Sequence, residues 1–360
     1  MPAIPAFPPT SFSILRIRAA GSVRRTPYTA PVTTKIAILG CGTVGRQVLL
    51  QIHAHLSRLA ALGRPVEVTG VLVRDPSRPR GLGALEGLLT ADASALGEAD
   101  LYIEVMGGTV RPLELLAPAI AAGKPLITAN KALLAERWDA LLPLAERGLL
   151  RYEASVMAAT PVIAPLAQLG RSAGPTSLEA VLNGTCSYIL SRMERGVSYR
   201  TALAEAQSLG YAEDPPTLDV DGWDAAHKLT VLGRLLFDPG FSLDRVAVQG
   251  IGDLHPEDLA AADRAGQALR LVAEISFEGG WRGRVWPKRL PKDHPLAWTP
   301  LSRNALLFSG TDGGTWLLSG PGAGGAATAS AILGDLFSWA QGIPGPRPLG
   351  WVAAPPPEPS

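Results

Sequence analysis

An acidic segment followed by a single lysine is the first feature of the sequence that could do chemistry. Residues 209–229 read LGYAEDPPTLDVDGWDAAHKL and place five carboxylates within twelve residues of a chain that is only 18% charged. From Asp221 onward the apolar spacing is helical, so Asp221, Asp224 and Lys228 are predicted to share one stripe. A lysine among carboxylates can move a proton, whereas acids at a helix start can simply favour the helix dipole. The neighbouring elements must decide between these interpretations.

A glycine turn near the start of the chain is one such element. KIAILGCGTVGRQVLLQIHAHL runs from an apolar strand through Gly40, Gly42 and Gly45 into a segment of helical spacing. In the pattern G-x-G-x-x-G, the first glycine permits the tight turn and the second lets the backbone approach a pyrophosphate. The third lets helix and strand pack closely. The turn predicts a dinucleotide-binding unit with the pyrophosphate at the helix N-terminus.

The second strand, VEVTGVLV, ends at Arg74-Asp75, where such a unit reads the ribose of its cofactor. Arg74, with Arg78 and Arg80 beyond it, suits a 2′-phosphate, whereas Asp75 suits a 2′-hydroxyl. These residues favour NADPH over NADH, although a solvated basic loop has the same composition.

Two further apolar strands, in ADLYIEVMGG and GKPLITANKALLA, alternate with helical segments as a parallel sheet requires. Ligands bind at the carboxyl ends of such strands, so Lys131 is better placed for chemistry than an ordinary surface lysine. Hydride delivered to a carbonyl creates an alkoxide, which needs a proton or a cation. A nicotinamide-binding fold therefore favours the proton-transfer interpretation of Lys228.

The chain divides into segments of different composition. Residues 35–152 are predicted to form the nucleotide-binding domain and residues 153–310 a second domain that mixes strands and helices. The glycine loop and helix at 311–342 are predicted to return to the first domain. Residues 1–34, proline- and arginine-rich without acid, and the proline-rich residues 343–360 are predicted to be disordered.

Composition excludes several classes of function. With 33 basic and 32 acidic residues, the chain has no field that would attract nucleic acid or anionic lipid. No apolar run reaches the ~20 residues of a membrane span. Cys41 and Cys186 lack metal-ligand spacing, so zinc is not expected. We expect a cytoplasmic protein whose partner is a small molecule.

Six ordered motifs then resemble the homoserine dehydrogenase family from Lys35 to about Gly342. They are GCGTVG, TANKALLA, YEASV, LNGTCSYIL, LGYAEDPPTLDVDGWDAAHKL and GPGAGGAATASAIL. The resemblance implies an α/β fold, with a Rossmann dinucleotide-binding domain plus an α+β substrate-binding and dimerisation domain. It also implies NAD(P)H-dependent, reversible reduction of L-aspartate 4-semialdehyde to L-homoserine, on the route to threonine, isoleucine and methionine. A homodimer or homotetramer is implied as well.

Carried over residue by residue, the resemblance assigns catalysis to Lys228, Lys131 and Asp224, with Lys228 as the acid in the reduction and the base in the reverse reaction. The residues that match substrate-binding positions are Glu213, Asp219, Asn183, Gly184 and Thr185. The residues that match cofactor-binding positions are Gly40, Gly42, Thr43, Val44, Gly45, Arg74, Gly108, Thr109, Thr128 and Lys131. NADPH is the expected cofactor, with NADH as a second possibility.

The chain departs from the family in three places. The loop after EASV, which matches a sodium site at Glu153, Val156, Ala158 and Thr160, lacks the family's glycines, although its carbonyls can still coordinate. Cys186 replaces a frequent threonine, and we expect it to be structural. Many relatives carry a C-terminal ACT domain or a fused aspartokinase, and the chain has room for neither, so feedback through such a module is not expected.

Two alternatives remain from the residues alone. Another NAD(P)-dependent amino-acid dehydrogenase on the same scaffold would keep the glycine turn without needing both lysine motifs. A non-catalytic NADP-binding sensor would bind cofactor and tolerate the loss of Lys228.

Overall fold

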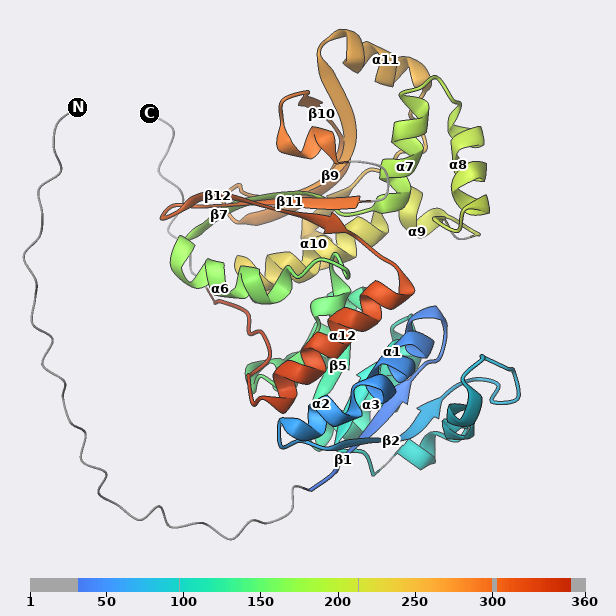
Figure 1. The fold of residues 1–360 in the computed structure, drawn as a ribbon. Helices are drawn as coiled ribbons and strands as arrows, with labels where there is room; N and C mark the ends of the chain where they lie inside the picture. The colour runs from blue at the N-terminus through green and yellow to red at the C-terminus, as the bar shows by residue number, and fades with distance from the viewer. Residues whose placement is uncertain (1–31, 97, 213, 300–302, 351–360) are drawn as a thin grey trace, which may run out of the picture. The chain divides into compact units, whose positions relative to one another are not determined.

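Two six-stranded sheets organise the chain (Figure 1). The computed structural model describes residues 32–96, 98–212, 214–299 and 303–350. Most of the residues predicted to be an N-terminal extension, the last ten residues of the predicted tail, and Glu213 lie outside this range. The first sheet is parallel and the second is mixed, so the α/β fold class is confirmed.

The first sheet has the strand order β3-β2-β1-β4-β5-β6. This is the order of a doubly wound dinucleotide-binding fold. Its strands are β1 (Thr34–Leu39), β2 (Val66–Leu72), β3 (Leu89–Thr90), β4 (Leu101–Glu104), β5 (Leu126–Thr128) and β6 (Leu150–Arg151). Ile36, Ala37 and Ile38 are all fully buried, because a parallel sheet is covered on both faces.

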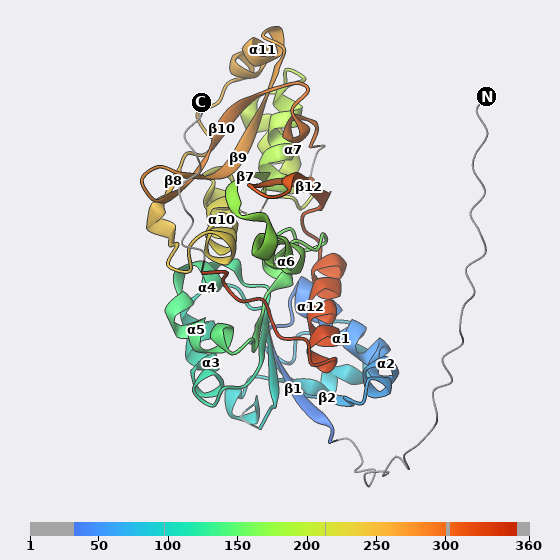
Figure 2. The same ribbon diagram turned by 90° about the vertical axis from the view of Figure 1, so that its left-hand side faces the viewer.

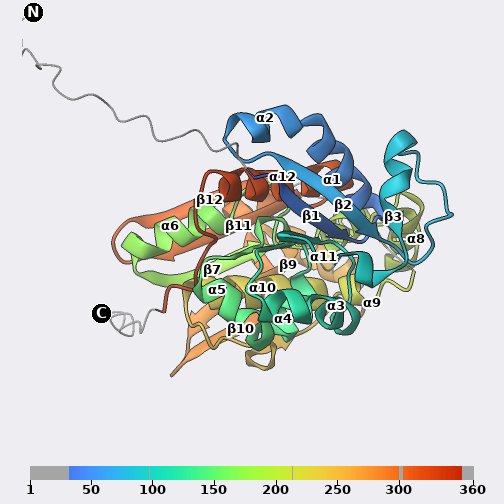
Figure 3. The same cartoon turned by 90° about the horizontal axis from the view of Figure 1, so that it is seen from below.

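Helices cover both faces of this sheet, as Figure 3 shows. On one side lie α1 (Thr43–Ala54), α2 (Leu56–Ala61) and α12 (Gly325–Ala340), and on the other lie α3 (Val110–Ala121), α4 (Lys131–Glu136) and α5 (Trp138–Glu146). Two 3₁₀ turns, η1 (Gly83–Leu88) and η2 (Ala93–Leu96), flank β3. Helix α12 comes from the far end of the sequence and packs along α1, where the Gln51 side chain donates to the Ala326 carbonyl at 3.1 Å.

The second sheet has the strand order β12-β11-β7-β9-β10-β8, and only β8 runs parallel to its neighbour. Its strands are β7 (Pro175–Val181), β8 (Val246–Val248), β9 (Gln267–Phe277), β10 (Trp281–Pro291), β11 (Arg303–Gly310) and β12 (Gly314–Pro321). Strand β12 thus pairs in the second sheet although it lies within the predicted returning segment, because a short turn folds it back on β11. Only α12 of that segment joins the first sheet.

The helices around the second sheet include α6 (Ile163–Ala173), α7 (Gly184–Met193), α8 (Tyr199–Ser208), α9 (Thr217–Val220), α10 (Trp223–Leu236) and α11 (Pro256–Arg264). Three 3₁₀ turns complete the chain: η3 (Glu153–Ser155), η4 (Leu243–Arg245) and η5 (Pro295–Trp298). No helix of the described residues is long and apolar enough to cross a membrane.

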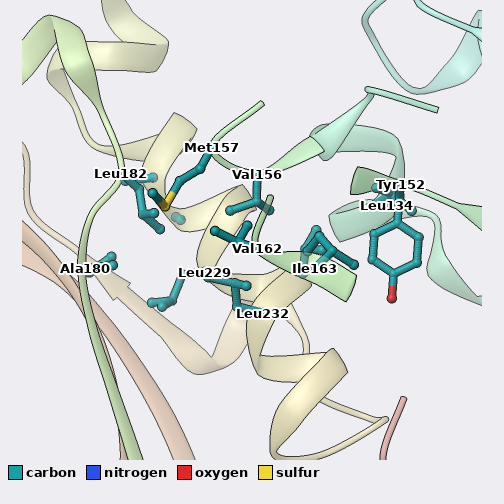
Figure 4. Close-up of a cluster of buried hydrophobic side chains, with 14 of the residues drawn as sticks. Leu134, Tyr152, Val156, Met157, Val162, Ile163, Ala180, Leu182, Leu229 and Leu232 are labelled. Carbon is teal, nitrogen blue, oxygen red and sulfur yellow. The ribbon is translucent and has the colours of Figure 1, made fainter. Parts of the chain in front are cut away.

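Helix α10 packs against β9 and β10 on one side and against α4 on the other (Figure 2). Its predicted apolar residues Leu229, Leu232 and Leu236 are all fully buried. Figure 4 shows Leu229 and Leu232 in one cluster with Leu134 of α4 and Ile163 of α6. A buried leucine stabilises a fold by ~1.5–3 kcal/mol, so this cluster fixes the helix that carries Asp224 and Lys228.

Candidate active site

The glycine turn between β1 and α1 has the geometry that the sequence predicts. Gly40 has a φ of +102°, and a Cβ atom there would lie 2.9 Å from the Val105 carbonyl oxygen. At Gly45 a Cβ would lie 2.2 Å from the Gly40 carbonyl oxygen, so both positions exclude a side chain. Among the described residues, Gly42 has no such neighbour within 4 Å and no side chain caps the helix behind it. The turn therefore leaves its backbone open to an anion at the start of α1.

A cleft of about 1240 Å³, which we call the glycine-turn cleft, opens beside this turn. Gly40, Gly42, Thr43 and Arg74, all predicted to bind cofactor, line it. Its arginines are Arg46, Arg74, Arg78, Arg80 and Arg111. Such a surplus of positive charge suits a ligand that carries phosphates.

The acid in this cleft, Asp75, is engaged within its own loop. Its carboxylate accepts hydrogen bonds from the Ser77 hydroxyl at 2.6 Å and the Ser77 backbone N–H at 2.9 Å, which hold its pKa below the usual value. Arg46 and Arg111 were missed from the sequence. Arg46 directly follows Gly45 and Arg111 lies three residues after Gly108, and these positions beside glycine loops were the available signal.

The other predicted cofactor residues do not line the cleft. Val44 and Gly45 lie within α1, while Gly108 and Thr109 follow the cleft residue Gly107 along the chain. Thr128 is fully buried, and its hydroxyl donates to Glu104 at 2.6 Å. Thr128 therefore bonds to the buried Glu104 carboxylate and is not itself part of the cleft lining.

Glu104, at the end of β4, was also missed. Its carboxylate accepts hydrogen bonds from the Met106 backbone N–H at 2.7 Å, the Thr128 hydroxyl at 2.6 Å and the Asn130 side-chain amide at 3.4 Å. Burial raises the pKa of Glu104, against the lowering effect of these donors. A glutamate inside the apolar strand LYIE was the signal, since a buried carboxylate needs such partners.

Asn130 connects the cleft to the start of α4. Its side-chain nitrogen donates to the Gly108 carbonyl at 2.7 Å, and its side-chain oxygen accepts from the Leu133 backbone N–H at 3.0 Å. The second bond makes Asn130 the N-cap of α4, whose first residue is Lys131. The loop beside the cleft and the predicted catalytic lysine are therefore held by one side chain.

Lys131 and Lys228 meet at Asp224. Lys228 Nζ lies 2.8 Å from Asp224 Oδ2, and Lys131 Nζ lies 3.1 Å from Asp224 Oδ1. Burial alone would raise the pKa of Asp224, but the charges of Lys228 and Lys131 outweigh it and hold that pKa well below the usual range. Lys228 Nζ also donates to the Leu182 carbonyl at 2.7 Å. The carboxylate thus stays ionised and orients both ammonium groups.

Asn183 adds a second carboxylate to the group. Its side-chain nitrogen donates to Asp224 at 2.9 Å and to Asp219 at 2.7 Å, and its side-chain oxygen caps α7 at the Cys186 N–H. Burial, followed by the charge of Asp224, raises the pKa of Asp219. We call Lys131, Asn183, Asp219, Asp224 and Lys228 the catalytic cluster, after the role predicted for Asp224 and the two lysines.

The rest of the NGT segment lies beside this cluster. Gly184 is the first residue of α7, and the Thr185 hydroxyl donates to the Tyr211 carbonyl at 2.6 Å. Cys186 is fully buried, and its thiol donates to the Asp219 carbonyl at 3.2 Å. Burial raises the pKa of Cys186 well above its usual value, so the thiol stays protonated.

The predicted stripe of Asp221, Asp224 and Lys228 is wrong at its first member. Gly222 has a φ of +90° and separates Asp221, which follows α9, from the start of α10. Asp221 is exposed whereas Asp224 is buried. A helical count through Gly222 could not register this break, since it assumes uniform helical angles.

The loop predicted to bind sodium follows η3. Glu153 accepts hydrogen bonds from the backbone N–H groups of Val162, Ile163 and Ala164 at 2.6 to 2.8 Å. The carboxylate therefore caps α6 and uses three of its roughly four acceptor positions in doing so. Met157 takes a φ of +49°, a left-handed conformation that glycine adopts at less cost. A carboxylate with loop carbonyls has the oxygen chemistry that a hard cation prefers.

Comparisons with known proteins match most of this chain. The profile described as "Homoserine dehydrogenase, NAD binding domain" matches residues 40–153, and the profile described as "Homoserine dehydrogenase" matches residues 161–337. The homoserine dehydrogenase of Corynebacterium glutamicum is 40% identical over 319 residues, which are 85% of this chain and 72% of that protein. The Bacillus subtilis enzyme is 35% identical over 312 residues, 84% of this chain and 72% of its own.

Solved structures agree with these matches. A crystal structure of a homoserine dehydrogenase from Thiobacillus denitrificans has a TM-score of 0.79 at 33% identity and covers 86% of this chain and 74% of that one. A hyperthermophilic archaeal homoserine dehydrogenase in complex with NADPH has a TM-score of 0.72 at 26% identity and covers 88% of this chain and 100% of that one.

Proposed function

Because the chain belongs to the homoserine dehydrogenase family, we propose that it catalyses the reversible reduction of L-aspartate 4-semialdehyde to L-homoserine through its catalytic cluster. It is an NAD(P)-dependent oxidoreductase that acts on a CH–OH group. Neither the sensor nor a different amino-acid dehydrogenase is favoured by these relatives.

The observation that carries the proposal is the shared carboxylate of Asp224. Two lysines from different elements, α4 and α10, lie within 3.1 Å of its two oxygens. An ion-paired ammonium group that also touches a backbone carbonyl has a fixed direction for its remaining proton. A purely structural ion pair would need only one of the two lysines.

When bound, the nicotinamide cofactor supplies hydride to the substrate carbonyl carbon or accepts it in reverse. Lys228 donates a proton from Nζ to the carbonyl oxygen as negative charge develops there, and it accepts the proton in the oxidation. Asp224 remains ionised and holds Lys228 in position. Lys131 keeps a second positive charge beside the developing alkoxide.

The amino-acid end of the substrate needs a carboxylate partner for its ammonium group. Asp219, oriented by Asn183, is our candidate, together with Glu213, which lies outside the described residues. Gly184 and Thr185 are the first two residues of α7, directly after Asn183. The charge of a bound ammonium group would lower the pKa of Asp219 again.

NADPH is the cofactor that the glycine-turn cleft supports best. Its five arginines outnumber Asp75, whose Oδ1 atom already accepts two hydrogen bonds from Ser77. A 2′-phosphate carries charge that such arginines can pair. NADH, which lacks that phosphate, is proposed as the weaker cofactor.

Three further parts of the proposal extend from the family. Sodium would be held by Glu153 with carbonyl oxygens of Val156, Ala158 and Thr160, as their oxygen chemistry allows. The chain would act as a homodimer or homotetramer through its second domain. We place it in the cytoplasm, on the route to threonine, isoleucine and methionine.

The deciding experiment follows the absorbance of the nicotinamide while aspartate 4-semialdehyde is reduced with NADPH and, in parallel, with NADH. We expect turnover with both and a higher kcat/KM with NADPH. Folded protein that turns over neither cofactor would contradict the proposed reaction. Faster turnover with NADH would contradict only the assignment of the arginines to a 2′-phosphate and would leave the proposed reaction intact.

A further inference from the structure

Helix α4, which begins with Lys131, is too short to hold its own position. It has six residues, Lys131–Glu136, and isolated helices of that length are unstable in water. Its neighbours must therefore decide where the Lys131 ammonium group lies. Asn130 caps its N-terminus, as described above. The question is what holds its other end.

Helix α10 contacts α4 at three levels. At the first residue of α4, Asp224 pairs with Lys131. At the last residue, His227 Nε2 lies 3.1 Å from Glu136 Oε1. Between them, Arg234 donates to the Leu134 carbonyl at 2.7 Å and to the Ala135 carbonyl at 3.4 Å.

Arg234 is a charged residue in a buried position between α10 and α4. It is only 5% exposed, and among the described residues it forms no ion pair with a carboxylate. Its guanidinium lies over the Trp138 ring, 4.9 Å from the centroid, and its Nε atom has no hydrogen-bond partner in the part of the chain that the structure describes. Burial lowers its pKa to about 10, so it remains charged at neutral pH.

If this side chain only filled space, an apolar residue here would make the protein more stable, because burying a charge is costly. The planar fork of arginine instead matches two consecutive carbonyls at the negative end of a helix. Leu134 and Ala135 are three and four residues after Lys131, so the bond fixes the helix immediately behind the lysine.

We propose that Arg234 is a positioning residue for the reaction. By donating hydrogen bonds to the C-terminal carbonyls of α4, it keeps Lys131 at ion-pairing distance from Asp224. Asp224 and Arg234 belong to one helix and lie ~15 Å apart along it. Helix α10 therefore fixes the positions of both ends of α4. The inference rests on the proposed role of Lys131 in catalysis.

The test is a double-mutant cycle on kcat, with Arg234→Met, Lys131→Met and the double variant measured in the full-length protein. Without Arg234, α4 can pivot about its Asn130 cap, and a displacement of ~1 Å can lower a rate by ~100-fold. We expect Arg234→Met to lower kcat by ~10–100-fold and to leave the Kd for NADPH unchanged. In the Lys131→Met background the same change should lower kcat by less than ~2-fold, because its target is already gone.

Arg270 offers a matched control. It is also a buried arginine, 8% exposed, that donates to the Leu269 and Ala297 carbonyls. Unlike Arg234 it pairs with a carboxylate, that of Glu194, and it lies in the second sheet away from α4. Arg270→Met should lower the melting temperature without lowering kcat at a temperature where the protein stays folded. Arg234→Lys, which keeps the charge and one donor group, should recover part of the lost kcat.

Additive losses in the cycle would overturn the inference and leave the role of Lys131 intact. An unchanged kcat in Arg234→Met, or equal losses of kcat in Arg234→Met and Arg270→Met, would also overturn it. If Lys131→Met alone leaves kcat unchanged, the proposed role of Lys131 fails, and the positioning role fails with it. If Lys131→Met has no measurable turnover, partial recovery of kcat in Arg234→Lys supports the inference and no recovery overturns it.

Discussion

The glycine-turn cleft and the catalytic cluster both gather charge, but they arrange it differently. The cleft has five arginines against one acid, and Arg74, Arg78 and Arg111 are exposed to solvent. The catalytic cluster has two lysines against two aspartates, and Asp224 is buried with each oxygen paired. The arginines of the cleft therefore exceed its one acid, although Arg111 also pairs with Glu114, whereas the charges of the cluster pair with one another. Substitutions in the cluster should change the rate, and substitutions in the cleft should change affinity.

The largest expected effect belongs to Lys228. Lys228→Ala removes the proposed proton donor, and general acid catalysis contributes ~10²–10⁴-fold to a rate. We expect kcat to fall by ~10³-fold while the Kd for NADPH, measured by nicotinamide fluorescence, stays within ~2-fold. A weaker Kd with unchanged kcat would assign Lys228 to binding and remove the contrast between the two regions.

Asp224→Asn should have the next largest effect. It keeps the shape of the side chain but leaves Lys131 and Lys228 without a counter-charge, so we expect kcat to fall by ~10²-fold. Asp221→Asn, three residues earlier and exposed, is the matched control and should keep kcat within ~2-fold. Equal losses in both variants would mean that the whole acidic segment acts through its net charge.

A substitution in the cleft should change cofactor choice. Arg74→Ser removes one charge that faces the proposed 2′-phosphate, and such a charged hydrogen bond is worth ~1.5–3 kcal/mol. We expect KM for NADPH to rise by ~10-fold or more, KM for NADH to change little, and kcat to stay the same. Arg200→Ser, on the exposed face of α8, is the control. A fall in kcat with both cofactors would contradict the division between affinity and rate.

Asp335 on α12 is a carboxylate whose pKa is raised by burial, in contrast to Asp224, whose pKa the charges of two lysines hold low. Burial and the charge of Glu153 raise its pKa to about 7, although it accepts a hydrogen bond from the Glu153 backbone N–H at 3.0 Å and lies near the positive charge of Arg151. Because the folded protein binds this proton more tightly than the unfolded chain, the contribution of Asp335 to stability should fall as pH rises from about 4 to about 7.

Asp335→Asn should therefore be as stable as the wild type near pH 4 and more stable at pH 8. Three pKa units correspond to about 4 kcal/mol, which is an upper limit for the gain. Urea unfolding at both pH values measures it. A gain that is the same at both would show that ionisation of Asp335 is not its cause.

The contribution of Asp224 to stability changes with pH in the opposite direction. Its pKa is held low in the folded protein, so it contributes stability above the unfolded pKa, and this contribution is lost as pH falls below about 4.

The sequence predicted the parts of the site that depend on local geometry. The glycine turn, the helix with Asp224 and Lys228, and the apolar residues Leu229 and Leu232 follow from spacing over a few residues. Asp221 was misplaced because the left-handed Gly222 interrupts the helical count.

Contacts between distant segments were not predictable in the same way. Glu104 and Arg234 are polar residues in apolar surroundings, LYIE and GRLLF, and the sequence alone does not identify their partners. Their roles emerge only when β4 meets Asn130 and when α10 meets α4. Even the resemblance to a family, which assigned the lysines, carried no assignment for these two residues.

The pairing of α12 with α1 has a consequence for synthesis on the ribosome. Gln51 and Ala326, which bond across these helices, are 275 residues apart, and buried residues of both helices share one core. The first sheet is therefore translated early, but the face that carries α1 and α2 stays only partly covered until α12 has been translated. During that interval the apolar side of α1 is a binding surface for chaperones and a site for aggregation. The second sheet, although it is translated later, can bury its strands before the first is complete.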